Sequence, residues 1–245
     1  MTASTEATLT ITRADIGAMI RALWACKSPF RVLQNLWLEK YPFTPGGRVL
    51  DIGAKPTNSK MPTFLTGKSV DYLNSDTDEA GTISVDITDP PPKTLKKYNT
   101  VLILNVLEHV FDIDAAFRFL KAAAERNGDI VVIVPYAYPF HRAPADYWRL
   151  SKDWYPAAAQ RYGLDLVTLC PLSAGALSDA TGYFASTFNL YPVSDPIRRC
   201  SNALFLASVV IDRTLLSIFS LFGRRGTSYF KNPLGYACVF RLAAA

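Results

Sequence analysis

Two short apolar runs separated by an amphipathic stretch most constrain what this chain can fold into. Residues 101–104 and 130–134 are apolar throughout, which is typical of strands buried on both faces of a parallel sheet. Between them, residues 113–126 repeat apolar side chains at helical spacing, and Asn127 and Gly128 are residue types that end helices. A strand, a helix and a further strand form a βαβ unit, so the pattern predicts an α/β fold.

The same alternation extends over most of the chain. We expect strands at residues 48–53, 69–75, 82–86, 99–106, 129–134 and 164–169, and a last strand at 236–242. Helices are expected at residues 16–24, 30–38, 113–126 and 154–161. This order predicts a doubly wound, Rossmann-like sheet with helices on both faces.

We divide the 245 residues into a single domain with three parts. Residues 1–46 form N-terminal helices, residues 47–170 form the core, and residues 171–245 form a C-terminal helical insertion and the last strand. The chain has 49% hydrophobic and 19% charged residues, which is the composition of a globular protein. It is long enough to bury its own core.

Charge and cysteine content exclude several classes of protein. The formal charge of +5 comes from dispersed lysines and arginines, so we expect no nucleic-acid partner. The cysteines lie far apart, without the paired spacing of zinc ligands, and we expect reduced thiols and no metal site. They are Cys26, Cys170, Cys200 and Cys238. Because residues 1–13 are polar and do not resemble a secretion leader, we expect a cytoplasmic protein.

Polar residues follow the apolar strands at the points where the strands end. The first strand runs into Asp51 and Gly53, the second into Asp76, the third into Asp86 and the fourth into Asn105. Ligands of doubly wound sheets bind outside the carboxyl ends of the strands. These residues therefore predict a ligand site at one edge of the sheet.

This succession resembles the class I S-adenosylmethionine-dependent methyltransferases, in particular the type 11-like branch whose fourth strand ends in Leu-Glu-His. The triplet is present here as Leu107, Glu108 and His109, and the resemblance covers residues 48–170. It implies a seven-stranded sheet, methyl transfer and S-adenosylmethionine as the cofactor. It also implies a set of cofactor-binding residues, namely Asp51, Gly53, Asp76, Asp86, Ile87 and Asn105. Glu108 and His109 could form an acid–base pair, although in the family the triplet mostly shapes the turn after the strand.

The implied roles have physical reasons. Gly53 would let the backbone approach the cofactor closely. The carboxylate of Asp76 would accept hydrogen bonds from both ribose hydroxyls, and Asp86 with Ile87 would hold the adenine. The alternative is that Asp76 and Asp86 begin turns after their strands, as aspartates commonly do.

The first loop departs from the Asp-x-Gly-x-Gly pattern of the family, because the second glycine position holds Lys55. An ammonium group beside the cofactor's sulfonium is unfavourable unless the side chain turns outward to solvent. Two functions therefore stay open: an active methyltransferase, or a catalytically inactive relative that acts as a binding or assembly module. A nicotinamide-dependent oxidoreductase is disfavoured because no Gly-x-Gly-x-x-Gly follows the first strand.

Residues 135–149 resemble the Pro-x-x-Tyr-Pro-x-His and Asp-Tyr-Trp-Arg stretch of the same branch. This segment would form a pocket or lid for the methyl acceptor, a small molecule, saccharide or lipid-linked precursor methylated on oxygen or nitrogen. We predict His141 as the catalytic base and Asp146 as the residue that orients it. The alternative is that His141 binds a loop carbonyl while Asp146 and Arg149 form a pair that fixes the loop.

Residues 203–222 are almost wholly apolar, but Asp212 and Arg213 interrupt them. Neither side keeps the ~18 consecutive apolar residues of a membrane-spanning helix, so we expect none here. Three covers stay open for these side chains: the domain itself, a second copy in a homodimer, or the inner face of the membrane. If the membrane is the cover, its anionic headgroups would meet Arg198, Arg199, Arg213, Arg224, Arg225 and Lys231.

Overall fold

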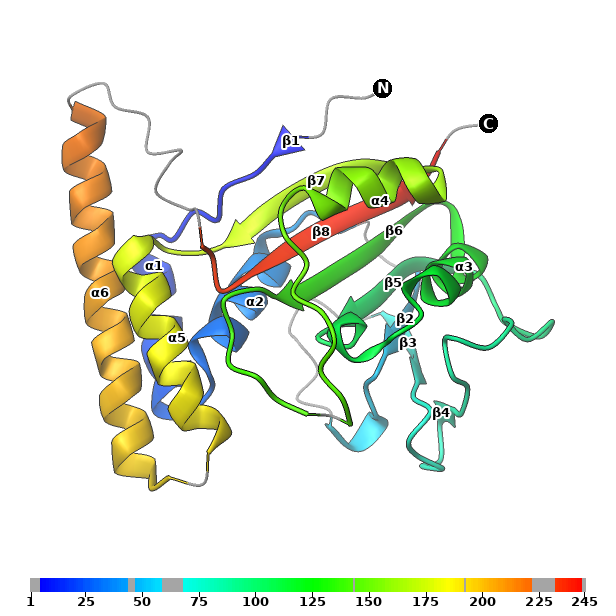
Figure 1. Cartoon of the computed structure of the whole chain (residues 1–245), viewed down its shortest axis with the longest axis horizontal. Coiled ribbons are helices and arrows are strands. Elements are labelled where there is room, and N and C mark those ends of the chain that lie inside the picture. Colours follow the sequence, from blue (N-terminus) through cyan, green and yellow to red (C-terminus); the bar gives the residue numbers. More distant parts are fainter. Residues whose placement is uncertain are drawn as a thin grey trace.

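A computed structural model describes residues 5–43, 47–58, 68–142, 144–191, 193–221 and 232–243 (Figure 1). Within these residues the centre is one sheet of eight strands, in the order β1-β7-β8-β6-β5-β2-β3-β4. The strands are β1 (Thr5–Glu6), β2 (Arg48–Ile52), β3 (Ser69–Leu73), β4 (Thr82–Ile83), β5 (Tyr98–Leu104), β6 (Ala124–Pro135), β7 (Leu164–Leu172) and β8 (Gly235–Leu242). All seven predicted strands are present, and the eighth is the two-residue β1, which pairs parallel to β7.

The strand directions bring the predicted ligand residues to one edge. β2, β3, β4, β5 and β6 are parallel neighbours, so their carboxyl ends meet at the same edge of the sheet. β8 lies between β6 and β7 and is antiparallel to both. The chain leaves the first strand in one direction across the sheet and returns in the other, which confirms the doubly wound order.

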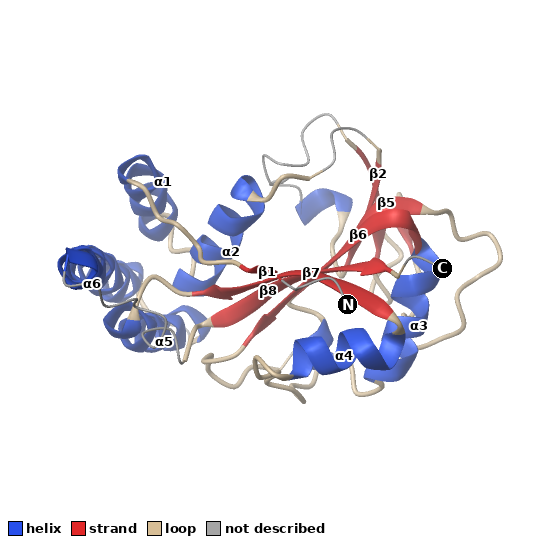
Figure 2. Cartoon of the chain, turned by 90° about the horizontal axis from the view of Figure 1, so that it is seen from above, coloured by secondary structure: helices blue, strands red, loops and turns tan. Residues whose placement is uncertain are grey.

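Helices cover both faces of the sheet (Figure 2). One face carries α1 (Arg13–Trp24) and α2 (Pro29–Lys40), and the other carries α3 (Ile113–Ala123) and α4 (Trp154–Tyr162). Each face has its own apolar core: Leu33 and Trp37 belong to the first, and Phe117 and Tyr155 to the second. Burial on both faces explains why the central strands are apolar throughout.

Local capping sets the start of the N-terminal helices. The side chain of Thr12 and that of Asp15 form a reciprocal capping box at the start of α1. Ser28 caps α2, and Pro29 occupies the first helical turn, where its missing N–H costs nothing. Both helices were predicted, and the caps place their starts slightly earlier than the apolar spacing alone suggests.

The helix predicted at residues 113–126 ends earlier, at Ala123. Strand β6 begins at the next residue and includes Asn127 (φ 69°) and Gly128, where its pairing with β5 shifts register. A Cβ at Gly128 would lie 2.9 Å from the carbonyl oxygen of Tyr98, so glycine is needed for the close approach to β5. The Asn-Gly pair therefore shapes the strand rather than the helix end.

The predicted C-terminal insertion is a pair of helices, α5 (Ala176–Leu190) and α6 (Asp195–Leu221), which pack together beyond one end of the sheet (Figure 1). Residue 222 of the predicted apolar segment lies outside the described residues. Among those residues, Asp195–Ile218 is the helical stretch long and apolar enough to cross a membrane, and 33% of its apolar window is buried within the chain. Length and composition alone are weak evidence for a span, because long core helices share them.

Asp212, which interrupts the apolar segment, joins the two helices of the insertion. It is fully buried, and its carboxylate accepts hydrogen bonds from the backbone N–H groups of Leu177 (3.3 Å) and Ser178 (2.7 Å). These N–H groups belong to the first turn of α5, where the helix supplies no acceptor of its own. The cap position is Gly175 (φ +149°), where a Cβ would overlap the Asp212 carboxyl group. A side chain from α6 thus caps α5.

Candidate functional site

A cavity of about 670 Å³ lies at the carboxyl edge of the sheet. Its wall includes five of the predicted cofactor residues, namely Gly53, Asp76, Asp86, Ile87 and Asn105. Asp51, His141 and Asp146 do not line it. The volume is in the range of sites that enclose small organic ligands.

Gly53 shapes the cavity through its backbone. Its φ is +84°, its N–H donates to the carbonyl oxygen of Leu73 at 2.7 Å, and a Cβ would overlap the side chain of Val106. Only glycine fits this conformation and this approach to the end of β5. Lys55, which follows in the loop, is not among the residues that line the cavity.

Asp76 and Asp86 line the cavity and also organise turns. The Asp86 Oδ1 accepts hydrogen bonds from the backbone N–H and the hydroxyl of Thr88, both at 2.8 Å. Asp76 accepts one from the Ser75 hydroxyl at 3.1 Å, and its own N–H donates to the Asn74 side chain at 2.9 Å. Both aspartates are exposed to solvent. Each aspartate therefore both organises a turn and lines the cavity, because the turn holds its carboxylate there.

Asn105 contributes a polar side chain with an unused hydrogen-bond acceptor. It has a positive φ of 56°, and its side-chain amide donates to the side-chain oxygen Oε1 of Gln34 at 2.8 Å. The Asn105 Oδ1 is buried and has no hydrogen-bond partner in the described part of the chain. Buried acceptors are normally satisfied, so this atom is open to a ligand. Gln34 was missed from the sequence, although a buried glutamine in an apolar helix is itself a signal.

Asp51 lies within β2, away from the cavity wall. Burial raises its pKa to about 7, and the charge of Arg31 lowers it only in part. Its carboxyl group therefore differs from the solvent-exposed carboxylates of Asp76 and Asp86. The cofactor role predicted for Asp51 stays a prediction.

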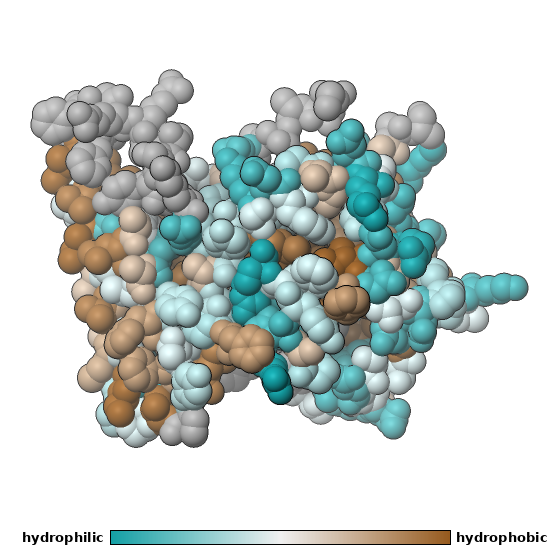
Figure 3. Space-filling view, in the orientation of Figure 1, coloured by the Kyte–Doolittle hydropathy of each residue, from teal (hydrophilic) through white to brown (hydrophobic). Residues whose placement is uncertain are grey.

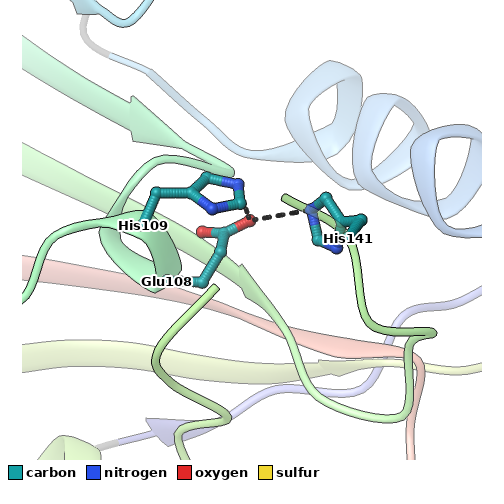
Figure 4. Close-up of side chains that lie close together, drawn as sticks. All are labelled: Glu108, His109 and His141. Carbon is teal, nitrogen blue, oxygen red and sulfur yellow. Dashed lines mark ion pairs between the residues drawn. The ribbon is translucent and has the colours of Figure 1, made fainter. Parts of the chain in front are cut away.

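A cluster of three titratable side chains lies beside the cavity (Figure 4). The Glu108 Oε1 is 3.7 Å from the His109 Nε2 and 4.0 Å from the His141 Nε2. Glu108 and His109 belong to the 3-10 helix Leu107–His109 after β5, and His109 lines the cavity. The two imidazole rings meet edge to face, with centroids 4.9 Å apart.

The Glu108 carboxyl group is fully buried, and neither oxygen has a hydrogen-bond partner in the described residues. Burial raises its pKa to about 8. Burial also lowers the pKa of His141. Both shifts reflect the cost of charge in a dry environment.

Asp146 and Arg149 form a two-pronged ion pair that fixes the loop. The Arg149 Nη1 lies 2.5 Å from one Asp146 oxygen, and the Nη2 lies 2.7 Å from the other. Asp146 also accepts the backbone N–H of His141 at 2.9 Å, and its Oδ2 lies 3.5 Å from the His141 Nδ1. Burial works to raise the pKa of Asp146, but these hydrogen bonds offset it, and the pKa lies below its ordinary value. The Asp146–Arg149 pair, which was the alternative role for these residues, is therefore present. Asp146 also holds His141 in position.

The segment 135–149 returns onto the turn after β5. The N–H groups of Tyr147 and Trp148 donate to the carbonyl oxygen of Glu108 at 2.8 and 3.3 Å, and the Trp148 indole donates to the Val110 carbonyl oxygen at 2.9 Å. Tyr147 lines the cavity beside Phe111, and their rings are 5.3 Å apart. This docking brings His141 to Glu108.

Solved structures share this architecture, whereas no protein family model and no curated protein sequence matches the chain. A candidate sarcosine dimethylglycine methyltransferase from Galdieria sulphuraria is 12% identical, with 92% of this chain and 98% of that chain covered and a TM-score of 0.54. A SAM-dependent methyltransferase from Archaeoglobus fulgidus is 14% identical, with 92% and 99% covered and a TM-score of 0.50. The [4+2]-cyclase SpnF is 13% identical, with 88% and 82% covered and a TM-score of 0.52.

Sequence identities this low support similarity of the fold alone. The cyclase shows that this fold does not determine the reaction. The sheet order, the antiparallel β8 and the helices on both faces agree with the fold expected from the Leu-Glu-His resemblance. The chain therefore has the fold of the class I S-adenosylmethionine-dependent methyltransferases.

Proposed function

We propose that this protein is an S-adenosylmethionine-dependent methyltransferase that acts on an oxygen or nitrogen of a small molecule or of a saccharide or lipid-linked precursor. One observation carries the proposal: Gly53, Asp76 and Asp86 come from three different strand ends and line one cavity. S-adenosylmethionine supplies an electrophilic methyl group on a sulfonium. The protein has to bind the two reactants in line and exclude water.

The residues present fit this cofactor. Gly53 presents its backbone in the cavity wall, and the exposed carboxylate of Asp76 can accept two ribose hydroxyls. Asp86 and the buried Ile87 offer an acceptor and an apolar surface to an adenine ring. The unpartnered Asn105 Oδ1 suits the protonated amino group of a methionine moiety.

His141 and Asp146 are the residues we propose for the acceptor side. Asp146 holds the His141 backbone, and the His141 Nδ1 faces the carbonyl oxygen of Pro139 at 3.2 Å. With the proton on Nδ1, the lone pair on Nε2 can accept a proton from an acceptor group. The His141 ring packs against His109, which lines the cavity.

Calorimetric titration with S-adenosylhomocysteine tests the cofactor site. We expect binding by the unaltered chain and about 30-fold weaker binding by Asp76→Ala, because two hydrogen bonds to a charged acceptor are lost. The matched control is Asp78→Ala, which removes an exposed carboxylate that does not line the cavity and should leave binding unchanged. Absence of binding up to millimolar ligand contradicts the proposal.

The second candidate function is a catalytically inactive module that keeps the fold for binding or assembly. Lys55, in place of the second loop glycine, favours it. Lys55→Gly separates the two: a decayed site gains affinity for S-adenosylhomocysteine, whereas a working site changes little because Lys55 lies outside the cavity wall.

We also propose a cytoplasmic location, with α5 and α6 against the inner face of the membrane. Apolar side chains gather over these helices, at the left of Figure 3. The exposed ones are Leu177, Tyr183, Phe184, Leu190, Tyr191, Ile197, Leu204, Val210, Ile211 and Ile218. Of the basic residues expected to meet anionic headgroups, Arg198, Arg199 and Arg213 belong to α6, whereas Arg224, Arg225 and Lys231 lie outside the described residues. An exposed apolar face suits a membrane surface, and a second copy of the chain is the competing cover.

A further inference from the structure

We propose that Glu108, His109 and His141 form a binding site for a divalent transition-metal ion such as Zn²⁺. The sequence contains two histidines in all, 32 positions apart, and the fold brings both to the same carboxylate. One ligand atom from each of the three side chains lies within 4.8 Å of the others. Two imidazoles and one carboxylate are a donor set that zinc and related ions prefer.

The imidazole rings are oriented as metal ligands are. The His109 Nδ1 faces the carbonyl oxygen of Ala145, and the His141 Nδ1 faces that of Pro139. A carbonyl accepts only from a protonated ring nitrogen, so each proton sits on Nδ1 and each Nε2 keeps a lone pair. Both Nε2 atoms face the Glu108 Oε1 (Figure 4). Backbone carbonyls that hold the second ring nitrogen are the usual support of metal-bound histidines.

Glu108 supplies the independent observation that a cation belongs here. Its side chain is fully buried, and neither oxygen accepts a hydrogen bond in the described residues. A proton shared with an imidazole does not explain this, since 3.7 and 4.0 Å exceed hydrogen-bond distance. The guanidinium of Arg149, whose charge acts on Glu108, is paired with Asp146 through both oxygens. A bound cation would satisfy the buried carboxylate directly.

Forming the site requires the cluster to contract, because its ligand atoms lie up to 4.8 Å apart. Metal–ligand bonds of about 2.0–2.2 Å in a tetrahedral site place donor atoms about 3.4 Å apart. The Glu108 Oε1 is already 3.7 and 4.0 Å from the two nitrogens. Because His109 lines the cavity, the ion would lie at the cavity edge. There it could polarise an acceptor hydroxyl in place of proton abstraction by His141, because the ion would occupy the His141 Nε2 lone pair. This role rests on the proposed methyltransferase function.

Metal analysis of the full chain tests the inference. We expect a sample stripped with EDTA and dialysed against Zn²⁺ to retain about one ion per chain. His141→Ala and Glu108→Gln should each weaken Zn²⁺ binding by about 100-fold or more, since each removes a ligand rather than a supporting group. Co²⁺ in place of Zn²⁺ should give the visible absorption of a nitrogen and oxygen site, which His141→Ala should abolish.

Cys200→Ser is the matched control, because Cys200 is an exposed thiol that could bind zinc adventitiously. It should leave the stoichiometry unchanged. The inference is overturned if one zinc ion per chain is still bound after His141→Ala, or if that ion is lost in Cys200→Ser. It is also overturned if the stripped chain takes up no ion. Thermal melts in EDTA verify that each variant folds. S-adenosylhomocysteine titration of the stripped chain separates the two proposals, since cofactor binding can persist where metal binding fails.

Discussion

Two buried carboxylates, one in each half of the molecule, have opposite surroundings. Asp212 in α6 and Glu108 at the carboxyl edge are both fully buried. Asp212 accepts two backbone N–H groups at the start of α5, whereas Glu108 has no hydrogen-bond partner in the described residues. A buried carboxyl group with hydrogen-bond partners stabilises its own fold, and one without partners costs free energy until a ligand arrives. The difference indicates that Asp212 serves the packing of the two insertion helices, whereas Glu108 is open to a ligand.

The largest effect on stability should come from Asp212 when each of the two carboxyl groups is replaced by its amide. Asp212→Asn should lower the free energy of unfolding by about 2 kcal/mol, because it weakens two charge-assisted hydrogen bonds. Glu108→Gln, measured in EDTA, should change it by less than about 0.5 kcal/mol or raise it, because no hydrogen bond is lost. Urea unfolding with comparison of m-values measures both. Equal losses in the two variants would break the comparison.

A smaller effect should come from Asp179, a second buried carboxylate of the insertion. Burial raises its pKa to about 8; the hydrogen bond from Ser173 opposes the shift, and the charge of Asp212 adds to it. The unfolded chain loses this proton near pH 3.8, while the folded chain holds it to about pH 8. Stability from this group is therefore complete below about pH 4, falls as pH rises, and is gone above about pH 8.

Asp179→Asn should remove that dependence. Relative to the unaltered chain, the variant should gain unfolding free energy as the pH rises from 5 to 8, because the group that loses a proton in the unfolded chain is gone. Urea unfolding at both pH values measures the gain, and the exposed Asp78→Asn is the control that should show none. A parallel pH profile for Asp179→Asn and the unaltered chain would show that this carboxyl group is ionised throughout.

The smallest effect on stability should come from the outer face of the insertion. Ile211 is 48% exposed, so Ile211→Glu should change the unfolding free energy by less than about 0.5 kcal/mol. It should weaken binding to anionic phosphatidylglycerol vesicles about fivefold, since about 1 kcal/mol of apolar burial is lost. Co-sedimentation measures vesicle binding, and the exposed Thr214→Ala is the control on the same helix. Absence of vesicle binding together with a dimeric mass in light scattering identifies a second copy as the cover instead.

The strand positions and the residues at the strand ends that line the cavity could be predicted from the sequence, because both are local features. Buried parallel strands are continuous apolar runs, and the polar residues that end them are adjacent in the chain. Gly53, Asp76 and Asp86 were found in this way. The departure at residues 124–126 arose because pairing of β6 with β5 drew the last residues of the predicted helix into the strand.

The histidine cluster could not be predicted because it depends on tertiary contacts. His141 reaches Glu108 only because the loop docks through the Tyr147 and Trp148 N–H groups onto the turn after β5. Periodicity carries no information on that contact. The same holds for Asp212, which the sequence presents as an interruption and the structure as a cap on another helix.

The position of β8 has a consequence for how the chain is made. This strand follows α5 and α6 in the sequence, yet it lies between β6 and β7 and pairs with both along most of its length. During synthesis at about 5–20 residues per second, β6 and β7 wait several seconds for the strand that joins them. Over that interval the nascent sheet has two unprotected apolar edges, so the ribosome-bound intermediate is the form of this protein most prone to aggregate.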